Sequence, residues 1–136
     1  MEQLLLAIPF QRLMGFTIPR AGHFFVCDHN ECWSVRLGHV SEITEHDGSP
    51  YDLAARPDFV GAGGGNNEVR QGGGAEIDYD FRPNEEFVAV HWRSRGRSGL
   101  IKFVLISGDW FAASLSTDGE YAVLAEPDAL LLYAAT

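Results

Sequence analysis

The sequence predicts an α+β domain that is predominantly antiparallel β, built as a meander sheet or as a small sandwich or half-open barrel with one or two short helices. Three observations predict this fold class. Residues 75–81 alternate strictly between apolar and acidic side chains, which is the period of a strand with one buried and one solvated face. Residues 87–92 and 100–106 are nearly continuous apolar runs, typical of central strands covered on both faces. Short polar turns separate these runs, and short connections favour hairpins between successive strands.

The composition is that of one packed domain spanning residues 1–136. The chain is 46% hydrophobic and 12% aromatic, which is enough apolar material for a core at this length. We found no internal repeat.

The first half of the chain predicts a helical start followed by a hairpin. Residues 2–14 are rich in Leu and Ile and are interrupted by Pro9, which favours one or two short helical turns ending near Gly15. Two strands are expected at 23–27 and 32–37, on either side of the polar turn 28–31. A weaker strand is expected at 40–45, closed by Asp47 and Gly48.

Residues 48–74 differ from the rest of the chain. They contain Pro50, Pro57 and seven glycines between Gly61 and Gly74, and no apolar period. This composition predicts a glycine-rich, flexible loop inside the domain, acting as a linker or a lid. It does not match a phosphate-binding loop, because no Gly-Lys-Ser/Thr ending is present.

The second half of the chain is more regular. Strands are expected at 75–81, 87–93, 100–106, 110–115 and 120–125, joined as a meander. The last segment, 127–133, has a proline followed by good helix formers, so it fits a short helix as well as a final strand.

The charge is strongly acidic, with 19 acidic against 10 basic residues and a formal net charge of −9. This balance opposes direct binding to nucleic acid or to an anionic membrane, and it is compatible with a basic partner. The N-terminal residues do not resemble a signal peptide, and no apolar run approaches the length of a membrane span. A cytoplasmic protein with reduced cysteines is therefore expected.

The acidic side of the alternating strand is the first candidate site. Glu76, Asp78 and Asp80 would share one face, about 6.6 Å apart from one to the next, and Glu85 and Glu86 follow directly. Such a face fits an ordinary solvated surface or a contact for a basic partner, and a metal-binding or acid–base role is a further alternative.

A basic turn is the second candidate. Arg93, Arg95 and Arg97 fall within five residues at a hairpin tip. They could bind an anion or the carboxylates of a partner, or they could be a solvated turn. If this tip lies beside the acidic strand, the arginines and carboxylates would pair within the domain. The acidic face would then no longer be a candidate binding surface.

The third candidate is the pattern Cys27-x-His29-x-x-Cys32. Thiolates and imidazoles suit zinc, but one cysteine pair across a hairpin is weak evidence. A redox-linked pair and two small buried side chains are the alternatives. No cofactor is expected. No nucleophile elbow is present, and His91, within an apolar strand, fits a core histidine or an acid–base group in a pocket.

These observations favour a small cytosolic binding protein over an enzyme. The first hypothesis is an inhibitor-like domain, such as a toxin's immunity partner or a phage-type inhibitor of a nucleic-acid-handling protein. The residues expected to contact its basic partner are Glu76, Asp78, Asp80, Glu85, Glu86, Arg93, Arg95 and Arg97.

Two other hypotheses stay open. One is a small-ligand-binding or hydrolytic β-barrel protein, with His91 and carboxylates in a pocket and 48–74 as a lid. The other is a homo-oligomeric accessory protein, for example a homodimer. An open acidic face favours binding, whereas a closed pocket containing His91 favours catalysis.

Overall fold

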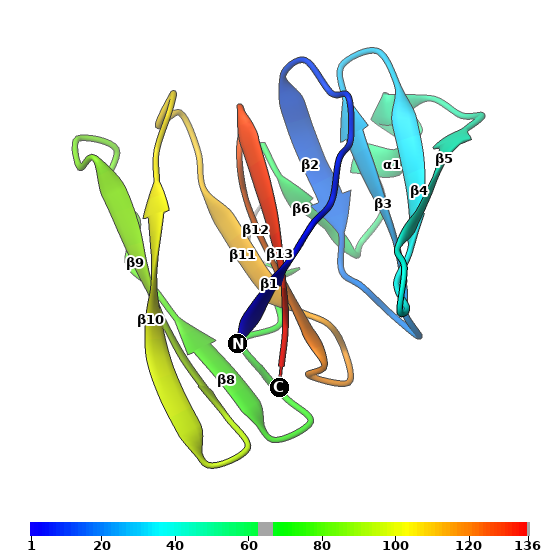
Figure 1. Ribbon diagram of the computed structural model, residues 1–136. Helices are drawn as coiled ribbons and strands as arrows, with labels where there is room; N and C mark the ends of the chain where they lie inside the picture. The colour runs from blue at the N-terminus through cyan, green and yellow to red at the C-terminus, as the bar shows by residue number, and fades with distance from the viewer. Residues whose placement is uncertain (63–66, 136) are drawn as a thin grey trace.

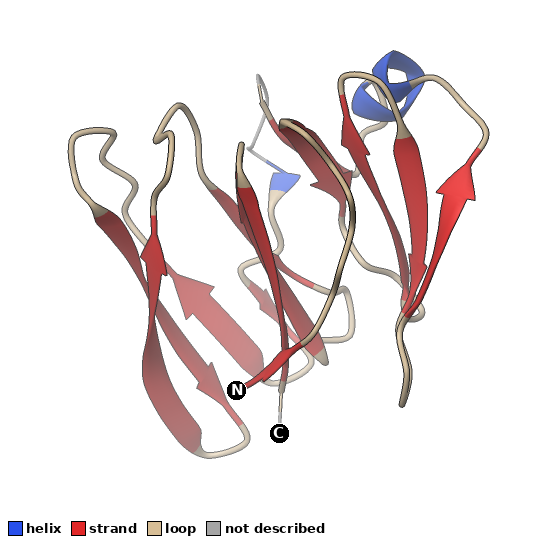
Figure 2. Ribbon diagram, turned by 45° about the horizontal axis from the view of Figure 1, so that its top comes forward, coloured by secondary structure: helices blue, strands red, loops and turns tan. Residues whose placement is uncertain are grey.

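The protein consists mostly of antiparallel β-strands. The structure is a computed structural model that describes residues 1–62 and 67–135. Among the described residues every strand pairing is antiparallel and α1 (Pro50–Ala54) is the one α-helix, so the β-rich prediction is confirmed. Figure 2 shows how strongly strands predominate and how α1 packs beside one of the sheets.

The strands form three sheets that lie side by side as layers (Figure 1). In spatial order, the first sheet contains β5 (Glu42–His46), β4 (Cys32–Arg36), β3 (His23–Asp28), β2 (Leu13–Thr17) and β6 (Phe59–Gly61). The middle sheet contains β1 (Glu2–Leu4), β13 (Ala129–Ala134), β12 (Tyr121–Glu126) and β11 (Ala112–Leu115). The third sheet contains β10 (Arg97–Val104), β9 (Phe87–Ser94), β8 (Ala75–Asp78) and β7 (Gln71–Gly72).

The middle sheet is covered on both faces, which explains why its strands are apolar throughout. Val123 and Ala125 of β12 belong to the core shared with the first sheet. Ala122 and Leu124, which point the opposite way, belong to the core shared with the third sheet. Successive residues of one strand thus stabilise two separate hydrophobic layers.

The helical turns predicted for residues 2–14 are wrong. This segment contains β1 and the start of β2, separated by residues without regular structure. β1 pairs with β13 at the other end of the chain, with Gln3 opposite Tyr133. Local leucine content favoured a helix, but the partner of β1 lies about as far away in sequence as this chain allows.

The prediction of one irregular loop over 48–74 is wrong in part, because α1, β6 and β7 lie within it. Ser49 caps α1 by accepting a hydrogen bond from the Tyr51 N–H, and Pro50 occupies the first helical turn. Leu53 is buried against the first sheet. Residues 63–66, within the glycine run, lie outside the described residues, and the flexibility expected for 48–74 stays a prediction.

The C-terminal segment is a strand, so the helical alternative for 127–133 is wrong. β13 pairs with β12 on one side and with β1 on the other. The predicted strands between 75 and 125 are confirmed, but they do not form one meander. β10 and β11 belong to different sheets, and the chain crosses between layers after Val104.

Candidate functional site

The solvent-facing side of the third sheet, here called the outer face, brings together four of the sequence candidates, Glu76, Asp78, His91 and Arg93. Strand alternation turns Val88 and Val90 of β9 into the core and leaves His91 and Arg93 outside. On β10, Ile101 and Phe103 are buried in the same way. The outer face consists of Glu76, Asp78, Phe87, Ala89, His91, Arg93, Ser98, Leu100, Lys102 and Val104.

Large apolar side chains are exposed on this face. Leu100 is 55% exposed, Val104 63% and Phe87 38%, and Ile106, just beyond β10, is 66% exposed. Phe87 lies directly opposite Val104 in the β9–β10 pairing. The Lys102 ammonium lies 4.3 Å from the centre of the Phe87 ring. Exposed apolar side chains that gather on one face of a soluble domain are typical of an interaction surface.

The acidic strand supplies the charged half of the outer face. Glu76 lies opposite Arg93, with 3.6 Å between Glu76 Oε1 and Arg93 Nη2. Asp78 lies opposite His91, and its carboxylate is 3.4 Å from the Arg70 guanidinium. The side chain of Asp78 remains 78% exposed. Of the basic turn, Arg93 pairs with the acidic strand, and Arg70, which lies outside that turn, pairs with Asp78.

Three further acidic candidates lie near this face. Asp80 follows β8, and its carboxylate accepts a hydrogen bond of 3.0 Å from Arg82 Nε. Glu85 and Glu86 are exposed in the turn before β9. These three acidic residues thus lie beyond the ends of β8 and β9, and the pair Asp78 and Asp80 is here called the acidic rim.

The structure separates the three arginines of the basic turn. Arg93 lies on the outer face beside Glu76. Arg95, at φ +53° in the β9–β10 turn, donates hydrogen bonds of 2.9 and 2.8 Å to the two Glu120 carboxylate oxygens and one of 3.1 Å to the Ala135 carbonyl. Arg97 begins β10 and is exposed. Arg95 consequently ties the third sheet to the middle sheet instead of joining a common anion site.

A shallow depression of about 650 Å³ lies on the outer face and is open to solvent. It is lined by Glu76, Asp78, His91, Trp92, Arg93, Ser98, Gly99 and Leu100. Within residues 1–62 and 67–135, no hydrogen bond or ion pair joins the His91 ring to a carboxylate.

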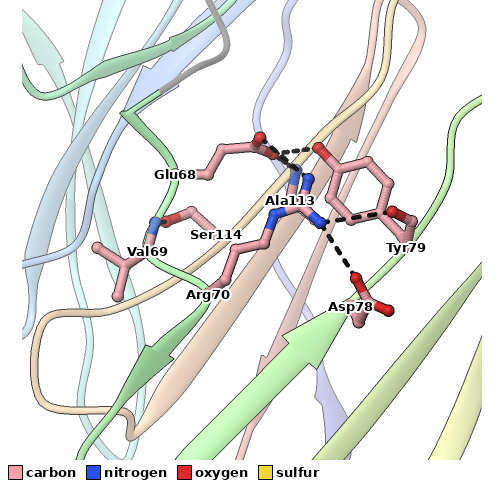
Figure 3. A network of polar contacts seen from close by, with 7 residues as sticks. All are labelled: Glu68, Val69, Arg70, Asp78, Tyr79, Ala113 and Ser114. Atoms are coloured by element: carbon pink, nitrogen blue, oxygen red, sulfur yellow. Dashed lines mark hydrogen bonds and ion pairs between the residues drawn. The ribbon is translucent and has the colours of Figure 1, made fainter.

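A polar network that the sequence did not reveal lies behind Asp78 (Figure 3). The Tyr79 hydroxyl donates to the Glu68 carboxylate, which also accepts a hydrogen bond of 2.7 Å from the Ala113 N–H of β11. The Arg70 guanidinium lies 4.1 Å from the Tyr79 ring centre and close to the Glu68 and Asp78 carboxylates. Burial, and then the hydrogen bond to Glu68, raise the pKa of Tyr79.

This network connects the outer face to the middle sheet. The Val69 N–H donates to Ser114 Oγ, the Leu115 N–H donates to the Val69 carbonyl, and the Ile77 N–H donates to the Arg70 carbonyl. The segment after the glycine run therefore bridges two sheets. The only sequence signal for it was the single apolar residue Val69 between two charged ones, too short a pattern to predict a bridge.

The cysteine candidates lie in another part of the molecule. Cys27 and Cys32 face one another across β3 and β4 and are buried, whereas His29 is exposed in the intervening turn. In the part of the chain that the structure describes, no group of three or more His, Cys, Asp or Glu side chains is placed to hold a metal ion. Burial raises the pKa of the Cys27 thiol to about 12. The structure thus brings together the two thiols but not the third proposed ligand.

Comparisons with known proteins supply no function for this fold or for its outer face. Among the described residues there is no helix of the length and apolarity that crossing a membrane requires. No family model, curated protein or solved structure matches the chain.

Proposed function

We propose that the protein is a binding domain that holds a basic protein partner on its outer face. The observation that carries this proposal is the exposure of Phe87, Leu100 and Val104 on one side of the third sheet, with the carboxylates of β8 on the same side. Because the opposite side of this sheet packs in a hydrophobic core, the backbone that presents these side chains is already ordered before binding. The inhibitor-like role inferred from the sequence, in which the domain covers a basic active site, belongs to this proposal.

The apolar and acidic parts of the outer face have different tasks in this proposal. Leu100 and Val104 supply the apolar area whose burial stabilises the complex. Asp78 and Asp80 attract and orient a partner rich in Lys or Arg. Their ion pairs with Arg70 and Arg82 are solvent-exposed, and such pairs are weak, so a partner's basic side chain can replace them.

Placing a photo-crosslinking amino acid at Leu100 tests whether a protein occupies this face. We expect a discrete covalent adduct with a basic protein in the source cell, because Leu100 lies in the depression and is more than half exposed. The matched control is the same amino acid at Thr44, an exposed position on β5 of the first sheet. Equal labelling from both positions would contradict the proposal, and an adduct of two copies of this chain would assign the face to a homodimer instead.

Charge reversal tests the acidic rim once the partner is identified. We expect Asp78→Lys combined with Asp80→Lys to slow association at low ionic strength by about tenfold, since steering by opposite charges acts mainly on the association rate. The control is Glu42→Lys combined with Glu45→Lys on β5, which changes the net charge by the same amount far from this sheet. Stopped-flow association rates at several salt concentrations measure both. An equal loss in the two variants would remove the specific role of the rim.

A further inference from the structure

The two cysteines occupy a backbone position that permits a direct bond between them. Cys27 of β3 lies opposite Cys32 of β4. The Asp28 N–H donates a hydrogen bond of 3.1 Å to the Glu31 carbonyl, so Cys27 and Cys32 form the next, non-hydrogen-bonded pair of this antiparallel ladder. The α-carbons of such pairs are about 4.5 Å apart, at the short end of the roughly 4.4–6.8 Å that a disulfide spans.

The two thiols lie close together in the reduced protein, because the pairing of β3 with β4 places Cys27 opposite Cys32. Each thiol also has one weak partner of its own near the start of α1. Cys27 Sγ lies 4.0 Å from the Pro50 carbonyl oxygen, and Cys32 Sγ lies 3.8 Å from the Gly48 carbonyl oxygen. Both sulfur atoms therefore contact the short segment from Gly48 to Pro50.

Both cysteines are buried, with Cys27 0% and Cys32 2% exposed, but their surroundings differ. Cys32 lines an open depression of about 220 Å³ together with Glu45, His46 and Gly48. His46 lies directly opposite Cys32 across β4 and β5. Cys27 lies one strand further in and is packed with Met14, Leu53 and Phe59. A small reagent in this depression therefore lies next to Cys32 and one strand away from Cys27.

We propose that Cys27 and Cys32 form a redox-active dithiol that closes reversibly to a disulfide by exchange with a small disulfide such as oxidised glutathione, and that exchange enters at Cys32. The Cys32 thiolate attacks one sulfur of the glutathione disulfide, whose S–S bond breaks to release one glutathione thiolate, which takes up a proton. The Cys27 thiolate then attacks the Cys32 sulfur and releases the second glutathione. The protein dithiol loses two electrons and two protons, and one glutathione disulfide becomes two glutathione thiols.

Burial sets the speed of this exchange. Because only the thiolate reacts, the raised pKa values of both thiols make the reaction slow at neutral pH. This property suits a pair that responds to sustained oxidation and is inert under reducing conditions.

Incubation of the purified protein with oxidised glutathione tests the proposal. We expect the loss of two titratable thiols, a mass decrease of two hydrogen atoms, no shift to a dimer on non-reducing gels, and full reversal by dithiothreitol. The variant Cys27→Ser should accumulate a glutathione adduct at Cys32, because no second thiol resolves it. The variant Cys32→Ser should form an adduct far more slowly, since Cys27 lies one strand further from the depression.

Three results would overturn the proposal: a wild-type protein that stays fully reduced, a wild-type protein that stops at a stable single adduct, or adducts that form equally fast on the two serine variants. If a serine variant fails to fold, alkylation and peptide mapping during oxidation of the wild-type protein replaces it. A transient adduct at Cys32 supports the proposed order, and a transient adduct at Cys27 contradicts it.

Discussion

Replacing Gly73 with alanine is expected to lower the free energy of unfolding by at least about 3 kcal/mol. Gly73 has φ +56°, in the left-handed region that L-residues with a side chain rarely adopt. A Cβ at this position would also lie 1.8 Å from the Asp118 carbonyl oxygen. Because that oxygen is backbone in the turn between β11 and β12, relief of the clash requires the third sheet to move away from the middle sheet.

The variant Gly74→Ala is the matched control. Gly74 has φ +79°, but a Cβ there meets nothing within 4 Å. The free energy of unfolding of Gly74→Ala should therefore fall by about 1 kcal/mol, which is the cost of holding alanine in the left-handed backbone conformation. Urea unfolding followed by tryptophan fluorescence measures both variants. Equal losses at the two positions would show that the close approach of the turns contributes nothing to stability.

Replacing Glu126 with alanine is expected to destabilise the protein by about 3 kcal/mol, because three backbone donors lose a charged acceptor. Glu126, at the end of β12, is fully buried. Its Oε1 accepts hydrogen bonds of 2.8 and 2.9 Å from the N–H groups of Ile106 and Ser107, and its Oε2 accepts one from the Asp128 N–H. This carboxylate fixes the segment where the chain crosses from the third sheet to the middle sheet.

Two further variants test whether the loss of stability in Glu126→Ala comes from the missing hydrogen-bond acceptor. Glu126→Gln keeps one acceptor oxygen in nearly the same volume, so its loss should be intermediate. Glu120→Ala removes an exposed carboxylate that pairs with Arg95, and exposed pairs contribute little. Thermal unfolding and the exchange rates of the Ile106 and Ser107 amide hydrogens measure the effect. Unchanged exchange of these two amides in Glu126→Ala would contradict the role assigned to the carboxylate.

The segments predicted best are those whose partners lie close in sequence. The hairpin at 23–37 and the strands near 75–81, 87–93 and 100–106 are all found, with small shifts at their ends. In each case apolar periodicity and a polar turn specify two neighbouring strands together. The segments predicted worst, 2–14 and 48–74, depend on contacts with distant parts of the chain. β1 is short and pairs with β13, and Leu53 is one apolar residue whose burial depends on the first sheet.

In the candidate site, too, local features were predicted from the sequence and contacts between distant segments were not. Alternation in 75–81 placed Glu76 and Asp78 on the face opposite Ile77, as the structure has them. The neighbours of these carboxylates could not be read from the same pattern. The register between β8 and β9 places Arg93 opposite Glu76 and His91 opposite Asp78. The packing of the third sheet on the middle sheet brings Glu120 to Arg95. A slip of one residue in that register would have reversed both faces.

Residue patterns alone decided that this chain is built of antiparallel strands, which of their side chains point inward, and that acidic residues line one strand. The tertiary structure decided which strands share a sheet, that three sheets lie in layers, and which charges meet. The physical reason is the distance along the sequence over which each effect acts. Side-chain alternation and turn chemistry act over a few residues. Three features depend on burial and register between segments that only the folded chain brings together. These are the pairing of β1 with β13, the approach of Gly73 to Asp118, and the position of Leu100 and Asp78 on either side of His91.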